Sequence, residues 1–184
     1  MDEQRLNETF IARETLVEGY LLHAYRDVVR VSDGSTSIRE WIRHVGAAAV
    51  VPLFEDGTTL LLRQFRYPPQ RTFWEVPAGK LDVEGEPPED CGRRELIEET
   101  GFAAEEWHHL GTCFPCIGYS NEEIHVFVAR KLTAVERPYV AGEVVEPIRL
   151  PFAKAVLMAK QGEILDAKTV FALIRAEYFL STLP

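Results

Sequence analysis

Three glutamates and one arginine stand close together in residues 94–99, Arg94-Glu95-Leu96-Ile97-Glu98-Glu99. On a helix of about 3.6 residues per turn, Glu95, Glu98 and Glu99 share one face. Two carboxylates about 6 Å apart repel by about 3 kcal/mol at an effective dielectric of about 20. Such a group is either a solvated helix face or a binding site for a divalent cation, and carboxylate oxygens suit Mg²⁺ or Mn²⁺. Arg94, four residues before Glu98, can brace the group by an ion pair.

The neighbouring residues predict how this group is positioned. Residues 72–76 are apolar and aromatic and predict a short strand, and Gly79 allows the following loop to turn. Pro87 and Pro88 suit the first turn of a helix, and Gly101 suits its C-terminal cap. The segment therefore predicts a strand, a loop, a helix and a second loop.

Residues 79–102 resemble the box of the Nudix hydrolase family. That box has a Gly, five residues, a Glu, seven residues, and then Arg-Glu-apolar-any-Glu-Glu-any-Gly-apolar. Every fixed position has a counterpart here: Gly79, Glu86, Arg94, Glu95, Leu96, Glu98, Glu99, Gly101 and Phe102. The chain departs from the pattern once, because residues 80–85 place six residues rather than five before Glu86. The extra residue lies in the loop, so it affects the position of Glu86 and of the Ala78 carbonyl but not the helix register.

The resemblance implies a metal-dependent hydrolase. It makes Glu95 and Glu99 direct ligands of Mg²⁺ or Mn²⁺, with Glu98 as a third or water-mediated ligand and the Ala78 carbonyl as a further one. Arg94 and Glu98 would then also belong to the catalytic machinery.

The composition limits the class of protein. The 184 residues suit one domain with an appended arm, and 46% hydrophobic and 27% charged residues are ordinary for a globular protein. A net charge of −9 disfavours long nucleic acid as a partner. The acidic N-terminal residues are no signal peptide and no apolar run reaches membrane-spanning length, so a cytoplasmic protein without a membrane partner is expected. Cys113 and Cys116 form a lone C-x-x-C, for which a zinc or redox site is disfavoured.

An N-terminal arm, residues 1–44, precedes the main domain at residues 45–184. Residues 17–31 and 36–44 predict a hairpin that turns at residues 32–35. The arm is similar to that of the ADP-ribose pyrophosphatase branch of the Nudix family, which implies a homodimer. In that branch Tyr20 and Trp41 would stack on adenine; alternatively, both simply pack against the sheet.

Other candidate substrate residues lie after the predicted strands at residues 45–54, 58–65, 106–113 and 123–132. Arg66, in a segment similar to the same branch, could reach a diphosphate, and Arg63 is the weaker candidate. Tyr119 and Ser120 are candidate walls of the pocket.

A general base is expected in the acidic loop at residues 141–147. The resemblance points to Glu143 first and Glu146 second, and Gly142 would give the loop freedom to move. The alternative is that both are loop carboxylates without a task. Residues 151–161 and 167–180 predict two helices that cover the sheet.

Together these features predict a Nudix α/β/α sandwich with a mixed sheet and an N-terminal β dimerisation arm. The favoured reaction is hydrolysis of ADP-ribose, a small nucleoside diphosphate derivative, to AMP and ribose 5-phosphate. GDP-mannose or a UDP-sugar is the alternative substrate. A nucleotide-sensing module without turnover stays open, and hydrolysis of capped RNA is disfavoured by the net charge.

Overall fold

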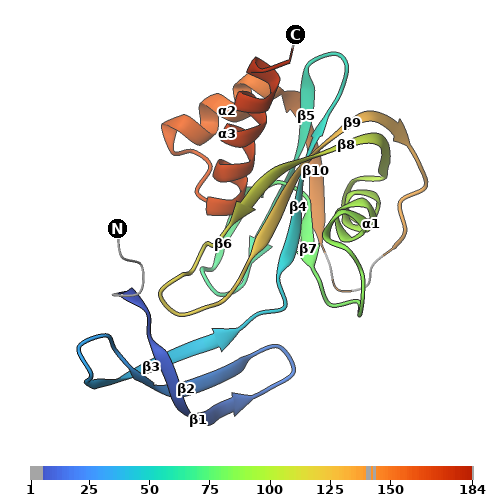
Figure 1. The fold of residues 1–184 in the computed structure, drawn as a ribbon. Helices are drawn as coiled ribbons and strands as arrows, with labels where there is room; N and C mark the ends of the chain where they lie inside the picture. Colours follow the sequence, from blue (N-terminus) through green and yellow to red (C-terminus); the bar gives the residue numbers. More distant parts are fainter. Residues whose placement is uncertain (1–5, 140–141, 143, 184) are drawn as a thin grey trace. The chain divides into compact units, whose positions relative to one another are not determined.

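The computed structural model describes residues 6–139, 142 and 144–183. These residues form two compact units. The N-terminal unit contains residues up to Val45 together with Cys116–Glu122, and the main unit contains Gly46–Pro115 and the residues from Glu123 onward. Figure 1 shows both units.

The N-terminal unit is built on a three-stranded antiparallel sheet in the order β1-β2-β3 (Figure 1). The strands are β1 (Thr9–Glu18), β2 (His23–Arg30) and β3 (Thr36–Arg43). The predicted hairpin is confirmed as β2 and β3, which pair antiparallel. Only its start at residue 17 was wrong, because the backbone N–H of Gly19 donates to the carbonyl of Leu22 (2.9 Å) and turns the chain there. All ten residues of β1 are exposed, so the strand has no alternation of burial that its sequence could display.

The main unit contains a mixed sheet with the strand order β10-β5-β4-β9-β8. Strand β6 pairs with β5, and β7 pairs with β4. The pairing of β4 with β9 is parallel and the other pairings are antiparallel. The strand bounds are β4 (Ala47–Leu53), β5 (Thr58–Arg66), β6 (Arg71–Glu75), β7 (Ala78–Lys80), β8 (Phe102–Cys113), β9 (Ile124–Ala134) and β10 (Val145–Pro151).

Helices cover both faces of this sheet (Figure 1). Every residue of β4 is buried, and its alternate side chains belong to different clusters. Ala49 and Val51 pack in the cluster that contains residues of α2 (Phe152–Gln161) and α3 (Ala167–Ser181). Val50 packs with Leu96 of α1 (Pro88–Thr100). A strand buried on both faces explains the continuous apolar run in its sequence.

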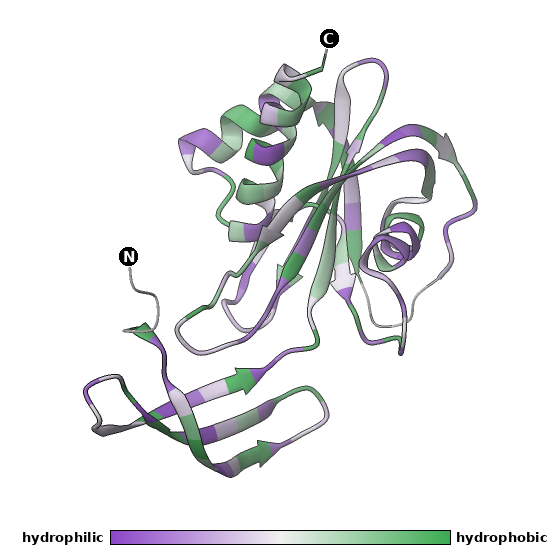
Figure 2. Ribbon diagram, viewed as in Figure 1, coloured by the Kyte–Doolittle hydropathy of each residue, from purple (hydrophilic) through white to green (hydrophobic). Residues whose placement is uncertain are grey.

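Helix α1 begins and ends where its sequence predicts. Pro88 is its first residue, and Glu89 and Asp90 in the first turn suit the positive end of the helix dipole. Gly101 ends it in the left-handed conformation (φ 73°), with its N–H donating to the carbonyl of Ile97. Figure 2 shows α1 as largely hydrophilic, whereas α2 and α3 carry many hydrophobic residues. In the described part of the chain, no helix is both long and apolar enough to cross a membrane.

Candidate active site

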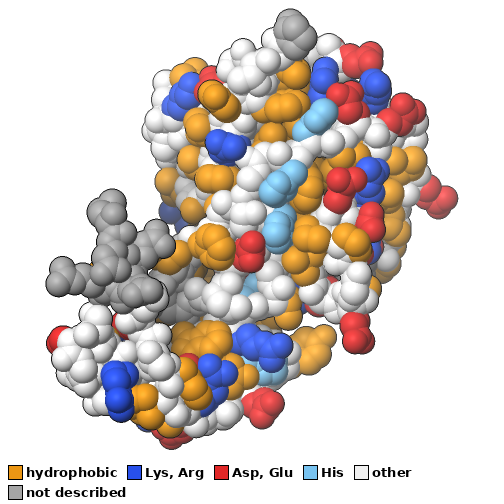
Figure 3. All heavy atoms as spheres, in the orientation of Figure 1, with side chains coloured by type: hydrophobic (Ala, Val, Ile, Leu, Met, Phe, Trp, Pro, Cys, Tyr) orange, Lys and Arg blue, Asp and Glu red, His pale blue; other side chains and the backbone are white. Residues whose placement is uncertain are grey.

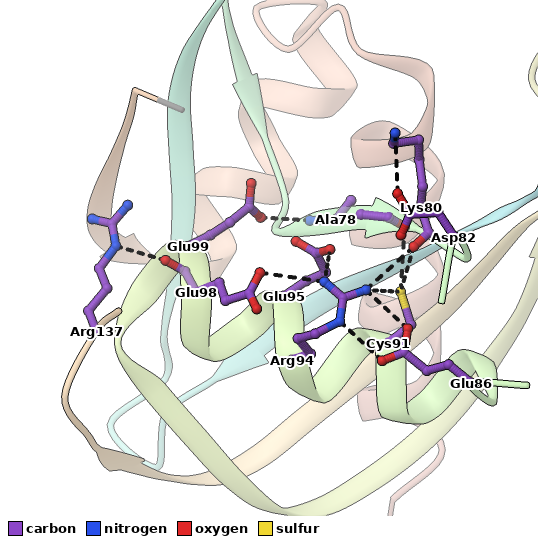
Figure 4. A network of polar contacts seen from close by, with 11 residues as sticks. Ala78, Lys80, Asp82, Glu86, Cys91, Arg94, Glu95, Glu98, Glu99 and Arg137 are labelled. Atoms are coloured by element: carbon purple, nitrogen blue, oxygen red, sulfur yellow. Dashed lines mark hydrogen bonds and ion pairs between the residues drawn. The ribbon is translucent and has the colours of Figure 1, made fainter. Parts of the chain in front are cut away.

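The three glutamates of α1 lie on the side of the helix that faces β7. Figure 4 shows Glu95, Glu98 and Glu99 on this side, with Glu99 reaching Ala78. Oε2 of Glu99 accepts a hydrogen bond from the backbone N–H of Ala78 (2.9 Å). Glu99 is only 2% exposed and Glu95 only 9%, while Glu98 is half-buried. The sequence predicted that the three glutamates share one helix face, and on that face Glu95 and Glu99 are buried while Glu98 is partly exposed.

Gly79 lets β7 approach the helix closely. A Cβ atom at Gly79 would lie 1.8 Å from Oε1 of Glu95. Any larger residue would displace this carboxylate, because atoms that are not bonded to each other cannot approach so closely. The first glycine of the segment is therefore required by the space that Glu95 occupies.

Arg94 is shared among several carboxylates (Figure 4). Its Nη1 donates to Oε1 of Glu95 (2.6 Å) and to Oε2 of Glu98 (3.4 Å), and its Nε and Nη2 donate to Glu86 (3.1 and 3.0 Å). The hydrogen bonds that Arg94 donates to Glu86 and Glu95 raise the pKa of Arg94, and those to Glu86 lower the pKa of Glu86. One guanidinium thus braces three carboxyl groups, and Glu99 is held separately.

The loop that contains the extra residue ends in a tight turn just before Glu86. Gly85 has a φ of 77°, and the N–H of Glu86 donates to the carbonyl of Val83 (3.1 Å), so the loop turns tightly before the helix. In this position Glu86 accepts hydrogen bonds from Nε and Nη2 of Arg94.

Arg66 lies at the end of β5, as the sequence indicated, but its partner was not anticipated. Its Nε and Nη2 donate to the two carboxylate oxygens of Glu75 (2.7 and 2.6 Å). The hydrogen bond with Glu75 raises the pKa of Arg66, and the charge of Glu99 adds to this effect. Of the α1 carboxylates, Glu99 is therefore the one whose charge acts on Arg66.

The structure describes only one of the two candidate general bases. Glu143 lies outside the described residues. Glu146 was expected in a loop, but it is the second residue of β10 and pairs in register with Arg63 of β5. It lines a cavity of about 680 Å³ whose described lining includes no carboxylate of α1. The cavity is lined by Arg63, Gln64, Phe65, Thr72, Gly142, Val144, Val145, Glu146 and Ile148.

Comparison with known proteins decides the family. A family model described as NUDIX domain matches residues 43–173. The chain belongs to the Nudix family. It is 36% identical over 170 residues to an ADP-ribose pyrophosphatase of Bacillus subtilis (strain 168), with 91% of each chain covered. It is also 35% identical over 174 residues to a GDP-mannose pyrophosphatase of Yersinia enterocolitica, with 86% of this chain and 88% of the relative covered.

A solved structure supports the Nudix fold. A crystal structure of an ADP compounds hydrolase matches with a TM-score of 0.83 at 22% identity and covers 96% of each chain. The predicted mixed α/β fold with helices on both faces of the sheet is confirmed.

The predicted base-stacking and wall residues of this Nudix chain all lie in the N-terminal unit. Tyr20 is fully exposed in the turn between β1 and β2. Trp41 is half-buried, and its Nε1 donates to Oδ2 of Asp27 (3.0 Å). The loop with Tyr119 and Ser120 pairs with the strand of Trp41, because the N–H of Ile42 donates to the carbonyl of Tyr119 (2.8 Å).

The orientation of Trp41 depends on a cluster that the sequence did not reveal. Asp27 is 7% exposed and accepts two hydrogen bonds from Arg13 (both 2.8 Å) as well as the one from Trp41. The guanidinium of Arg13 lies 5.0 Å from the ring of Trp41 and 4.8 Å from that of Tyr25. Alternation in β2 could have placed Asp27 on the same side as Tyr25, but the contact with β1 depends on a strand that was not predicted.

The α1 cluster has the chemistry of a divalent metal site. Its donors are carboxylate oxygens, two of them on buried residues, and one arginine is shared among them. Among the described residues, no three His, Cys, Asp or Glu side chains are already arranged to hold a metal ion. Glu95 is turned toward Arg94 and Glu99 toward the N–H of Ala78, so an ion would compete with these partners. The chemical type and the burial of these residues therefore suit a divalent cation.

Proposed function

We propose that this Nudix protein hydrolyses ADP-ribose to AMP and ribose 5-phosphate with Mg²⁺ or Mn²⁺. The observation that carries the proposal is the burial of Glu95 and Glu99 beside Ala78 and Gly79, because two buried carboxylates on one helix face offer the oxygen donors that Mg²⁺ or Mn²⁺ prefers. The relatives named as pyrophosphatases and the complete Nudix box support a nucleoside diphosphate-sugar pyrophosphatase.

The residues of the cluster would have separate tasks. Glu95, Glu99 and the carbonyl of Ala78 would hold the ion, with Glu98 as a third carboxylate ligand. A divalent cation bound there would supply Lewis acidity and offset the charge of the diphosphate. Arg94 would keep Glu95 and Glu98 in their orientation through its hydrogen bonds.

The remaining residues would bind the substrate and move a proton. Arg66 would donate its free N–H groups to diphosphate oxygens. A glutamate, Glu143 first and Glu146 second, would accept a proton from the attacking water as the new phosphorus–oxygen bond forms and the bridging bond breaks. Trp41 and Tyr20 would stack on the base, and Tyr119 and Ser120 would line its pocket.

A homodimer is part of the proposal. Strand β1 is exposed along its whole length, and apolar side chains of this unit reach the surface (Figure 3). The exposed apolar residues of the unit include Phe10, Ile11, Leu16, Val17, Leu21, Leu22 and Ile38. A second copy would cover part of this surface. Light scattering of the purified chain should give twice the mass of one chain.

The second candidate substrate is GDP-mannose or a UDP-sugar. It is favoured by the relative named as a GDP-mannose pyrophosphatase, whose identity of 35% is close to the 36% of the ADP-ribose pyrophosphatase. Stacking on Trp41 and Tyr20 would accept any base, so these residues do not separate the candidates.

A turnover screen tests the proposal directly. The purified chain is mixed with ADP-ribose, GDP-mannose or UDP-glucose, with and without Mg²⁺, and the released mononucleotide is measured. We expect metal-dependent release of AMP from ADP-ribose at the highest kcat/KM. Faster release of GMP or UMP would favour the second candidate, and binding without release would favour a sensing module.

A further inference from the structure

Lys168 of α3 is linked to Arg66, the arginine proposed to bind the diphosphate. The link is the buried carboxylate of Glu75, which contacts both side chains. Nζ of Lys168 forms ion pairs with Glu75 and with Oδ2 of Asp166 (2.9 Å). Glu75 is 3% exposed and also accepts both hydrogen bonds from Arg66. The chain of contacts therefore runs from the first turn of α3 through β6 to the end of β5.

Lys168 lies in the first turn of α3, where a positive charge does not stabilise the helix. It is the second residue of α3, at the positive end of the helix dipole, where a lysine is unfavourable. The helix is already capped by Asp166, which accepts from the N–H of Thr169 (3.1 Å). The side chain of Lys168 is only 13% exposed, so it has also given up most of its hydration. The position of Lys168 is thus better explained by Glu75 than by the stability of α3.

The contact with Glu75 fixes the plane of Arg66 and leaves donors unused. A guanidinium has five N–H groups, and the paired bonds to Glu75 use one on Nε and one on Nη2. Among the residues that the structure describes, none accepts a hydrogen bond from Nη1 or a second one from Nη2, so these N–H groups remain for another acceptor. The side chain of Arg66 is 44% exposed, so these donors can be reached from solvent.

Lys168 also offsets negative charge beside Arg66. With Lys168 as a second partner, Glu75 is shared between two cations. Burial would raise the pKa of Glu75, but the hydrogen bond from Arg66 and the charge of Lys168 outweigh it and lower that pKa. The charges of Arg66, Lys168, Glu75 and Asp166 sum to zero, whereas without Lys168 the other three groups carry a net negative charge, which would weaken the attraction of a diphosphate.

We propose that Lys168 and Glu75 are positioning residues, which hold Arg66 in one orientation and with its positive charge available for the diphosphate of the substrate. This inference rests on the proposed function, in which Arg66 touches the diphosphate. Neither Lys168 nor Glu75 touches the reacting atoms.

Kinetics of Lys168 variants give the first test. Lys168→Met removes the charge and keeps the length of the aliphatic chain. We expect it to raise KM for ADP-ribose by about ten- to a hundredfold, the range of a charged hydrogen bond, with a smaller change in kcat. Lys168→Arg should restore most of the loss. The matched control is Lys160→Met, which removes an exposed ion pair between α2 and α3 (Lys160 to Glu177, 2.7 Å) and should leave both constants unchanged.

Binding of inorganic pyrophosphate gives the second test, which does not depend on the choice of substrate. Calorimetry with Mg²⁺ present should show weaker binding of pyrophosphate to Lys168→Met by a similar factor. If this variant unfolds at a lower temperature than the wild type, Lys168→Gln, which keeps a neutral donor for Glu75, is measured in its place and should show the same loss.

The outcomes separate the two proposals. Unchanged KM and unchanged pyrophosphate affinity in folded Lys168 variants would overturn the inference, while wild-type turnover of ADP-ribose would still support the function. A wild type that binds pyrophosphate but does not cleave ADP-ribose would overturn the function. Weaker pyrophosphate binding by the variants would in that case still support the role of Lys168.

Discussion

Helices α1 and α3 pack on opposite faces of one sheet but bury different kinds of side chain. The buried residues of α3 are Thr169, Ala172, Leu173 and Ala176, none of which is charged. Those of α1 include Glu95 and Glu99. Apolar burial stabilises a fold by about 25 cal/mol per Å², whereas buried carboxylates cost free energy unless they are paired. The difference indicates that the buried face of α3 serves packing, whereas the buried face of α1 also holds charged groups, which depend on partners such as Arg94 and the N–H of Ala78.

The largest expected effect is on turnover and comes from α1. Glu99→Gln removes the charge of one proposed metal ligand, but the amide oxygen can still accept from the N–H of Ala78. Turnover of ADP-ribose should fall at least about a hundredfold, and the thermal midpoint should stay the same or rise. Steady-state kinetics and calorimetric melting measure the two effects. Glu105→Gln, at an exposed position of β8, is the matched control, and near-normal activity of Glu99→Gln would refute the ligand assignment.

A substitution in the buried face of α3 should have the opposite effect, a loss of stability without a loss of turnover. Leu173 is fully buried, so Leu173→Ala should lower the free energy of unfolding by about 2–5 kcal/mol through lost contacts and a cavity. The kcat per folded molecule should not change. Urea unfolding and kinetics at 25 °C check this pair of results. Leu157→Ala, at an exposed position of α2, should change the stability little, and a large loss of kcat in folded Leu173→Ala would break the comparison.

Substitutions of Trp41 test whether this residue of the N-terminal unit binds the substrate, as proposed for α1 residues, or only packs, as the buried residues of α3 do. If its ring stacks on the base, Trp41→Ala should raise KM by about tenfold or more with a smaller change in kcat, because stacking is worth about 1–3 kcal/mol. Trp41→Phe keeps an aromatic face and loses only the hydrogen bond to Asp27, so it should keep most of the affinity. An unchanged Michaelis constant in Trp41→Ala would assign the ring to packing.

The smallest expected effect is a pH dependence of stability at Glu75. Its pKa is lowered in the folded state, so its stabilising contribution is present above its unfolded pKa of about 4.3 and is lost as the pH falls through the folded value. The difference in unfolding free energy between wild type and Glu75→Gln should therefore be largest near pH 6 and shrink below about pH 4. Urea unfolding across this range measures it. Glu177→Gln, at a half-buried position in a surface ion pair with Lys160, should show a smaller difference throughout, and a constant difference for Glu75→Gln would contradict the assignment.

Predictions from the sequence succeeded where local signals agree. The prolines and Gly101 bound α1 correctly, and the apolar runs placed β4, β5 and both C-terminal helices within a few residues. They failed where pairing with distant residues decides the element. Strand β1 has no buried residue, and the three residues of β7 are a strand because they pair with β4.

The sequence by itself determined the register of Glu95, Glu98 and Glu99 on one helix face, because helical spacing depends only on residues a few positions apart. It also identified Arg66 as the cation at a strand end. Tertiary structure decided which of these carboxylates are buried, that Glu146 belongs to a strand, and that Lys168 meets Glu75 across 93 positions of the chain. Such contacts form when α3 packs against a face of the sheet, and no local pattern encodes the distance between residues that only folding brings together.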